Sequence, residues 1–172
     1  MIVYEIIDDG TLCEILNTIL PYEKIKVSKS SGVIATWYVI DLPNDEIHVL
    51  IRQFSFEGET IGDVVFYHPI TQFALTGNST VAETSGIVAT VINICELFPN
   101  VTTWFFSAKG GEDVPNKELM RRTSLYNRIS SRMARTKGWG FYPLHSKGDT
   151  FYILSKHQID SKKIYRFAST FE

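Results

Sequence analysis

The segment "RRTSLYNRISSRMARTKGWGFYPL", residues 121–144, contains the side chains best suited to chemistry. It surrounds Tyr126 with arginines, then reaches Gly138 and becomes aromatic. Arginine binds phosphate and carboxylate groups, and a tyrosine hydroxyl can donate or accept a proton. Three interpretations therefore stand side by side: a surface that binds nucleic acid, an ordinary amphipathic helix, and a helix that delivers a catalytic tyrosine.

Winding residues 117–137 as a helix separates two faces. Tyr126 falls on an apolar face with Leu119, Ile129 and Met133. The arginines of the opposite face are Arg121, Arg128, Arg132 and Arg135. This predicts an amphipathic helix in which Tyr126 is either a core aromatic or a catalytic group. The arginine face is either solvated or bound to an anionic partner.

The overall composition bounds these interpretations. The chain has 172 residues, of which 44% are apolar and 13% aromatic, so we expect a single compact domain spanning 1–172. The net charge of -2 and the pI of about 6.1 differ from the strongly basic balance of a nucleic-acid-binding domain, so nucleic acid is kept only as an alternative partner. Between Arg52 and Lys109 the chain carries carboxylates and no lysine or arginine, which predicts an acidic middle region.

Hydrophobic patterns predict the order of the elements. A short helix is expected at 12–20, strands at 32–42, 46–56, 63–75 and 101–108, a helix from a capping box at Thr80 and Glu83 to Pro99, the helix at 117–137, and a final strand pair within 139–156. Short polar links make the first three strands an antiparallel meander, whereas the helix before 101–108 permits a parallel pair. The fold class is therefore α/β (α+β), with a mixed, mostly antiparallel central sheet and packed helices. Residues 157–172 have no clear period and are treated as a C-terminal extension.

This order of elements resembles the GCN5-related N-acetyltransferase fold over about residues 30–155. "TSGIVATVINICELFPNVTTWFFS" (84–107) looks like the family's segment from its cofactor turn through its central helix into the next strand. "SLYNRISSRMARTKGWGFYPL" (124–144) is similar to the family's "A-x-x-L-Y-x-K-x-G-F" ending, with Leu125 and Tyr126 at the Leu-Tyr pair. The resemblance implies a GNAT-like domain that uses acetyl-coenzyme A.

The resemblance also implies roles for individual residues. Tyr126 would be the general acid that protonates the leaving thiolate, with His68 or a water as the base. Backbone N–H groups at the start of the central helix would hold the pyrophosphate. The cofactor segment would comprise Leu75, Thr76, Gly77, Asn78, Ser79 and Thr80. No basic residue accompanies this segment in the sequence, and Glu57 and Asp63 are the other candidate bases.

Two functions from different classes remain open. The first is an acyl-coenzyme A-dependent N-acyltransferase that transfers an acetyl group to an amine on a small molecule or a protein. The second is a catalytically inactive binding module, viral or regulatory, that contacts a protein or nucleic-acid partner through its arginine-rich helix. The sequence predicts no metal site, no membrane span and a cytoplasmic location, with Cys13 and Cys95 as buried thiols.

Overall fold

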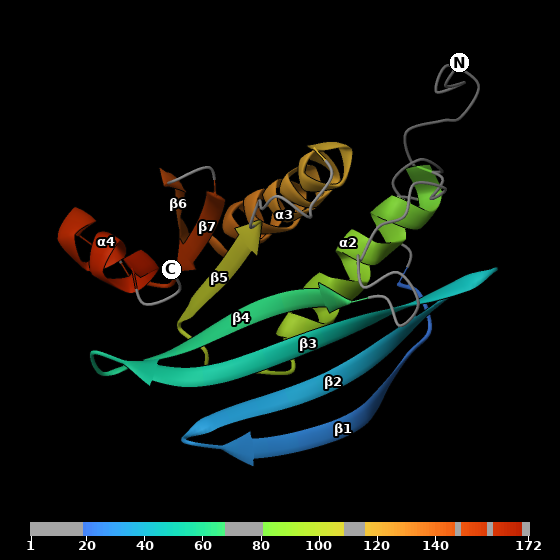
Figure 1. The fold of residues 1–172 in the computed structure, drawn as a ribbon, viewed down its shortest axis with the longest axis horizontal. Helices are drawn as coiled ribbons and strands as arrows, with labels where there is room; N and C mark the ends of the chain where they lie inside the picture. Colours follow the sequence, from blue (N-terminus) through green and yellow to red (C-terminus); the bar gives the residue numbers. More distant parts are fainter. Residues whose placement is uncertain (1–18, 68–80, 109–115, 147–148, 158–159, 170–172) are drawn as a thin grey trace.

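The computed structural model describes residues 19–67, 81–108, 116–146, 149–157 and 160–169. In chain order the elements are β1 (Tyr22–Ser30), β2 (Val33–Leu42), β3 (Asp45–Phe56), β4 (Glu59–Tyr67), α2 (Val81–Cys95), β5 (Thr103–Ala108), α3 (Asn116–Lys137), β6 (Gly140–Ser146), β7 (Asp149–Ser155) and α4 (Ser161–Ser169). The strands form one seven-stranded sheet with the order β1-β2-β3-β4-β5-β7-β6 (Figure 1). Among the described strands, only β4 and β5 pair in parallel. The predicted mixed, mostly antiparallel sheet with packed helices is confirmed.

The first four strands are an antiparallel meander with tight turns. Glu57 and Gly58 join β3 to β4 with φ angles of 45° and 81°. Two left-handed residues match the right-handed twist of a hairpin. The predicted start of this strand at Asp63 is wrong, because residues 59–62 already pair with residues 53–56. Residues 68–75 of the predicted strand lie outside the described residues.

The edge strand β1 was not predicted from the sequence. Ile25 and Val27 alternate with polar residues, which is a short strand signal in the sequence, yet both side chains are about half exposed, at 50% and 54%. The register to β2 also shifts between Lys24 and Lys26, which interrupts the period of two. Pairing with β2 therefore decides the conformation of this segment. Of the predicted helix at 12–20, residues 12–18 lie outside the described parts, and residues 19–20 are not helical.

The middle of the chain follows the predicted order. After β4 the described chain resumes with α2, which leads to β5, and α3 then leads to the β6–β7 hairpin. The predicted helix at 117–137 is confirmed as α3, and Gly138, with a φ of 69°, follows its last residue. Glycine adopts this left-handed conformation without steric cost, which explains why the helix ends there.

The sheet has two differently covered faces. On the first face, α2 and α3 pack against a continuous apolar core that includes Ile40, Val49, Val64, Phe66, Trp104, Phe106, Ile87, Val91, Leu125, Ile129 and Met133. On the second face, the C-terminal helix α4 contributes Ile164 to a smaller cluster with Ile61, Phe105, Phe151 and Ile153. Figure 1 shows β6 and β7 between α3 and α4, so the helices cover opposite faces.

Helix α4 is the second element that sequence reasoning missed. It begins after Asp160, whose carboxylate accepts the backbone N–H of Lys163 at 2.8 Å. Asp160 is thus a helix N-cap, a signal that the sequence does contain. Ile164, Phe167 and Ala168 also stand at helical spacing, but nine residues give only two turns of this pattern, and packing against the second face stabilises the helix.

Candidate functional site

Among the described strand pairs, the parallel pair β4–β5 has the shortest ladder. Its ladder contains only three residue pairs, Ile61 with Thr103, Gly62 with Trp104 and Asp63 with Phe105. Both strands continue beyond the ladder, β4 to Tyr67 and β5 to Ala108. Figure 1 shows them diverging from this point. Ligands of open sheets bind beyond the carboxyl ends of parallel strands, so the opening is the natural place for a site.

Tyr126 lies at this opening on the first face of the sheet. Its ring centroid is 5.5 Å from that of Phe66 on β4 and 5.8 Å from that of Phe106 on β5, and both phenylalanines lie beyond the paired residues. The tyrosine is 4% exposed. Helix α3 therefore packs the ring of Tyr126 against both separating strands, in surroundings that largely exclude water. No pattern in the sequence distinguishes Phe66 and Phe106 from ordinary core residues.

The arginine face of α3 does not project uniformly into solvent. A guanidinium N–H of Arg128 donates to the hydroxyl of Ser85 at 3.1 Å. Ser85 is buried in α2, one turn from the helix start at Val81. The first backbone N–H groups of a helix have no intrahelical acceptor and attract anions. Arg128 thus brings a positive charge to the amino-terminal part of α2, although no basic residue lies near this segment in the sequence.

The other predicted anion-binding residues do not share one environment. Arg132 is half-buried and lines a shallow cavity of ≈ 160 Å³ with Ile19, Ala89, Ile92, Asn93 and Glu96. Arg135 is exposed. The side chain of Arg121 lies outside the described residues, although its backbone belongs to α3. The expected continuous arginine surface is therefore divided between contacts to α2 and solvent.

Two of the candidate bases already hold arginine partners. Asp63, on the second face, is 4% exposed and receives Arg52 Nε on its Oδ1 at 2.9 Å, while a second guanidinium N–H donates to Oδ2. This hydrogen bond raises the pKa of Arg52, which keeps the pair charged. Glu57 accepts two hydrogen bonds from Arg166. Neither carboxylate is placed as a free base, so the interpretation of Glu57 and Asp63 as bases is not supported.

Several predicted site residues lie outside the described part of the chain. They are His68, Leu75, Thr76, Gly77, Asn78, Ser79 and Thr80. Of the predicted thiols, Cys13 also lies outside, whereas Cys95 is buried as expected. Burial raises the pKa of the Cys95 thiol, which makes it a poor nucleophile.

The chain matches no family model, no curated protein and no solved structure. Among the helices of the described segments, none combines the length and apolar character needed to cross a bilayer. The described side chains also bring together no group of three or more His, Cys, Asp or Glu residues that could hold a metal ion.

Proposed function

We propose that this protein is an acyl-coenzyme A-dependent N-acyltransferase whose reaction takes place where β4 and β5 separate. The observation that carries the proposal is the position of Tyr126 between Phe66 and Phe106, immediately beyond the three-pair ladder. A hydroxyl at this place can meet a group inserted between the strands. The resemblance to GCN5-related N-acetyltransferases assigns the same role to a tyrosine at this point of the chain.

The residues of this site fit the two ends of an acyl-coenzyme A. The pyrophosphate is an anion, and both the start of α2 and the guanidinium of Arg128 favour negative charge. The thioester supplies an activated acyl group to an acceptor amine. Tyr126 holds the proton that a departing thiolate requires, and the two phenylalanine rings exclude water from its surroundings. Alignment and proton transfer are the contributions expected from the protein.

A second function is a binding module that has the same fold and no acyl transfer. The burial of Tyr126 favours this alternative, since its aromatic ring itself packs between β4 and β5. In that case the exposed part of the arginine surface, represented by Arg135, would contact a protein or nucleic-acid partner. The two functions differ in whether coenzyme A binds.

Thermal unfolding with and without coenzyme A or acetyl-coenzyme A tests the proposal. Ligand at about 100 times its Kd is expected to stabilise the protein by roughly 2.7 kcal/mol. For a domain of this size the midpoint should rise by roughly 5–11 °C. An unchanged midpoint at millimolar ligand would contradict the proposal and favour the binding module.

Arg128→Ala tests the anion-binding end of the site. Loss of a charge-assisted contact to phosphate is expected to raise the Kd of coenzyme A by about tenfold or more. Arg135→Ala is the matched control, because it removes the same charge from the same helix two turns further from the start of α2. Isothermal titration of both variants measures the difference, and equal Kd values would remove Arg128 from the site.

A further inference from the structure

The seam between β4 and β5 is held by few bonds within the sheet itself. We define the seam as residues 60–63 of β4 with residues 102–105. Its ladder has three residue pairs, and the backbone N–H of Thr102 adds one hydrogen bond of 3.0 Å to the carbonyl of Thr60. The antiparallel partners β3–β4 and β5–β7 have nine and six residue pairs. The sheet is therefore two well-paired halves, β1–β4 and β5–β7–β6, joined along a short seam.

Helix α4 crosses this seam on the second face. The helix follows β7 in the chain, so its start is attached to the β5–β7–β6 half. Ile164 is 8% exposed and packs in one cluster with Ile61 of β4, Phe105 of β5 and Ile153 of β7. A side chain of α4 thus belongs to a cluster that includes strands on both sides of the seam.

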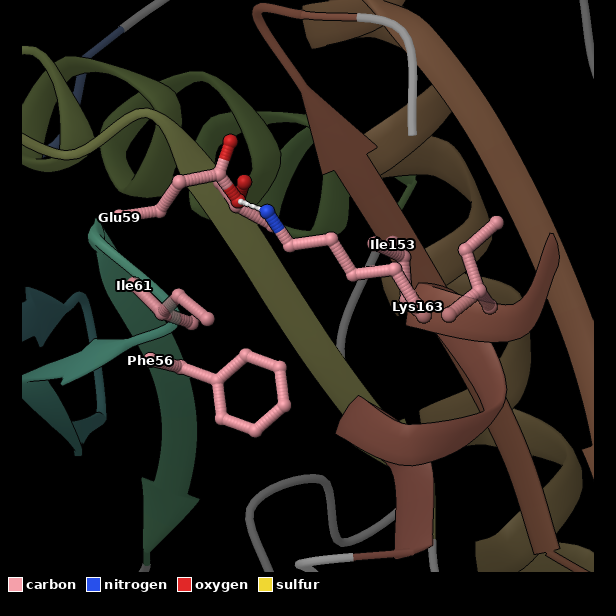
Figure 2. A pocket seen from close by; sticks show the side chains of 7 residues that line it. Phe56, Glu59, Ile61, Ile153 and Lys163 are labelled. Atoms are coloured by element: carbon pink, nitrogen blue, oxygen red, sulfur yellow. Dashed lines mark ion pairs between the residues drawn. The ribbon is translucent and has the colours of Figure 1, made fainter. Parts of the chain in front are cut away.

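Two ion pairs attach α4 to the opposite half. Arg166 donates from Nε and from a terminal nitrogen to the two carboxylate oxygens of Glu57, each at 2.9 Å. Lys163 Nζ lies 3.1 Å from Oε2 of Glu59, and Figure 2 shows the lysine side chain extending from α4 toward this carboxylate. Glu57 belongs to the β3–β4 turn, and Glu59 begins β4. Both acceptors therefore belong to the half that does not carry α4.

The contact between α4 and the sheet combines apolar packing with ion pairs. A small cavity lies beneath Lys163 and Ile164 and is lined by Phe56, Ile61 and Ile153 (Figure 2). Its volume of ≈ 10 Å³ is no larger than the space that one water molecule needs. The hydrogen bond from Arg166 lowers the pKa of Glu57, and Lys163 lowers it further. The lowered pKa keeps Glu57 charged at neutral pH, and the exposed Glu57–Arg166 pair should weaken as salt screens it.

We propose that α4 is an ionic clasp across the β4–β5 seam, and that its two ion pairs hold the two halves of the sheet together on the second face. When the clasp opens, the second face of the seam is held only by the short ladder and the Thr102–Thr60 hydrogen bond, while the core of the first face still spans both strands. The clasp limits local opening of the seam, and raised salt weakens it. This inference does not rest on acyl transfer, since the seam exists whatever binds at its open end.

Amide hydrogen exchange at the seam tests the clasp. Arg166→Glu removes both hydrogen bonds to Glu57 and places two carboxylates together, so exchange at Thr102 and in β5 is expected to quicken about fivefold or more. The amide of Asp41, which donates to the carbonyl of Pro21 at 2.9 Å in the meander, should keep its rate. Lys162→Glu is the matched control, because Lys162 is exposed on the same helix and the change in charge is equal.

A double variant that reverses both charges of the pair provides a second test. Glu57→Arg combined with Arg166→Glu reverses the pair without abolishing it and is expected to restore slow exchange at Thr102. In the unmodified protein, the amide of Thr102 should exchange faster as the salt concentration rises. This measurement does not depend on the folding of any variant. The proposal is overturned if the amides of the seam exchange at the same rate in the Arg166→Glu and Lys162→Glu variants. It is also overturned if the exchange rate of the Asp41 amide rises as much as that of Thr102.

Discussion

Tyr126→Phe is expected to lower the rate of acyl transfer by about 10²–10⁴-fold, because the substitution removes a proton donor and keeps the ring. The ring contacts with Phe66 and Phe106 remain possible, so the opening between β4 and β5 should keep its shape. Loss of one buried hydroxyl is expected to change the free energy of unfolding by about 1 kcal/mol. Steady-state kinetics with an acetyl-coenzyme A donor, together with thermal unfolding, measures both effects.

Tyr152→Phe is a suitable control for this substitution. Tyr152 is also a buried tyrosine, 6% exposed, but it lies on β7 and stacks on Phe141 with ring centroids 5.9 Å apart. Burial raises the pKa of its hydroxyl, as expected for a tyrosine with a structural role. The control should retain full activity. If Tyr126→Phe also retained it while coenzyme A still bound, Tyr126 would be a core aromatic and not the acid.

Gly62→Ala is expected to destabilise the protein by about 3 kcal/mol, because overpacking a filled core forces side chains or backbone to move. A methyl group at position 62 would lie 2.5 Å from Cζ3 of Trp104, whose side chain is 2% exposed and fully enclosed by the core. Gly62 and Trp104 are the middle pair of the β4–β5 ladder, so the strain falls on the seam. For a domain of this size the midpoint should fall by roughly 6–12 °C.

Gly140→Ala provides the comparison for Gly62→Ala. Its new methyl group would meet the hydroxyl end of Tyr142 at 2.8 Å, and Tyr142 is a half-buried side chain on the edge strand β6, where less of the surroundings must shift than around Trp104. We expect a cost below about 1 kcal/mol. Combining Gly62→Ala with Trp104→Leu should remove most of the clash, so the double-mutant cycle should yield a favourable coupling. Additive costs would mean that the indole does not restrict position 62.

Local patterns were sufficient where burial follows a regular period. The helix at 116–137, its end at Gly138 and its buried Tyr126, Ile129 and Met133 all follow from the sequence, because one face of an amphipathic helix must be buried. The antiparallel meander follows from short polar links in the same way. The segments β1 and α4 were missed because one is an exposed edge and the other is short. Their conformations depend on neighbours distant in the chain.

By itself, the sequence determined the class of the fold and the side chains available for chemistry, since periodicity and turn residues act over a few neighbouring positions. Only the tertiary structure decided which of those side chains meet. It brings Tyr126 between Phe66 and Phe106, Arg128 to Ser85, and Arg166 to Glu57 across 109 positions of sequence. Such contacts depend on how the strands separate and on which face each helix covers. That arrangement minimises the free energy of the whole domain and appears in no local pattern.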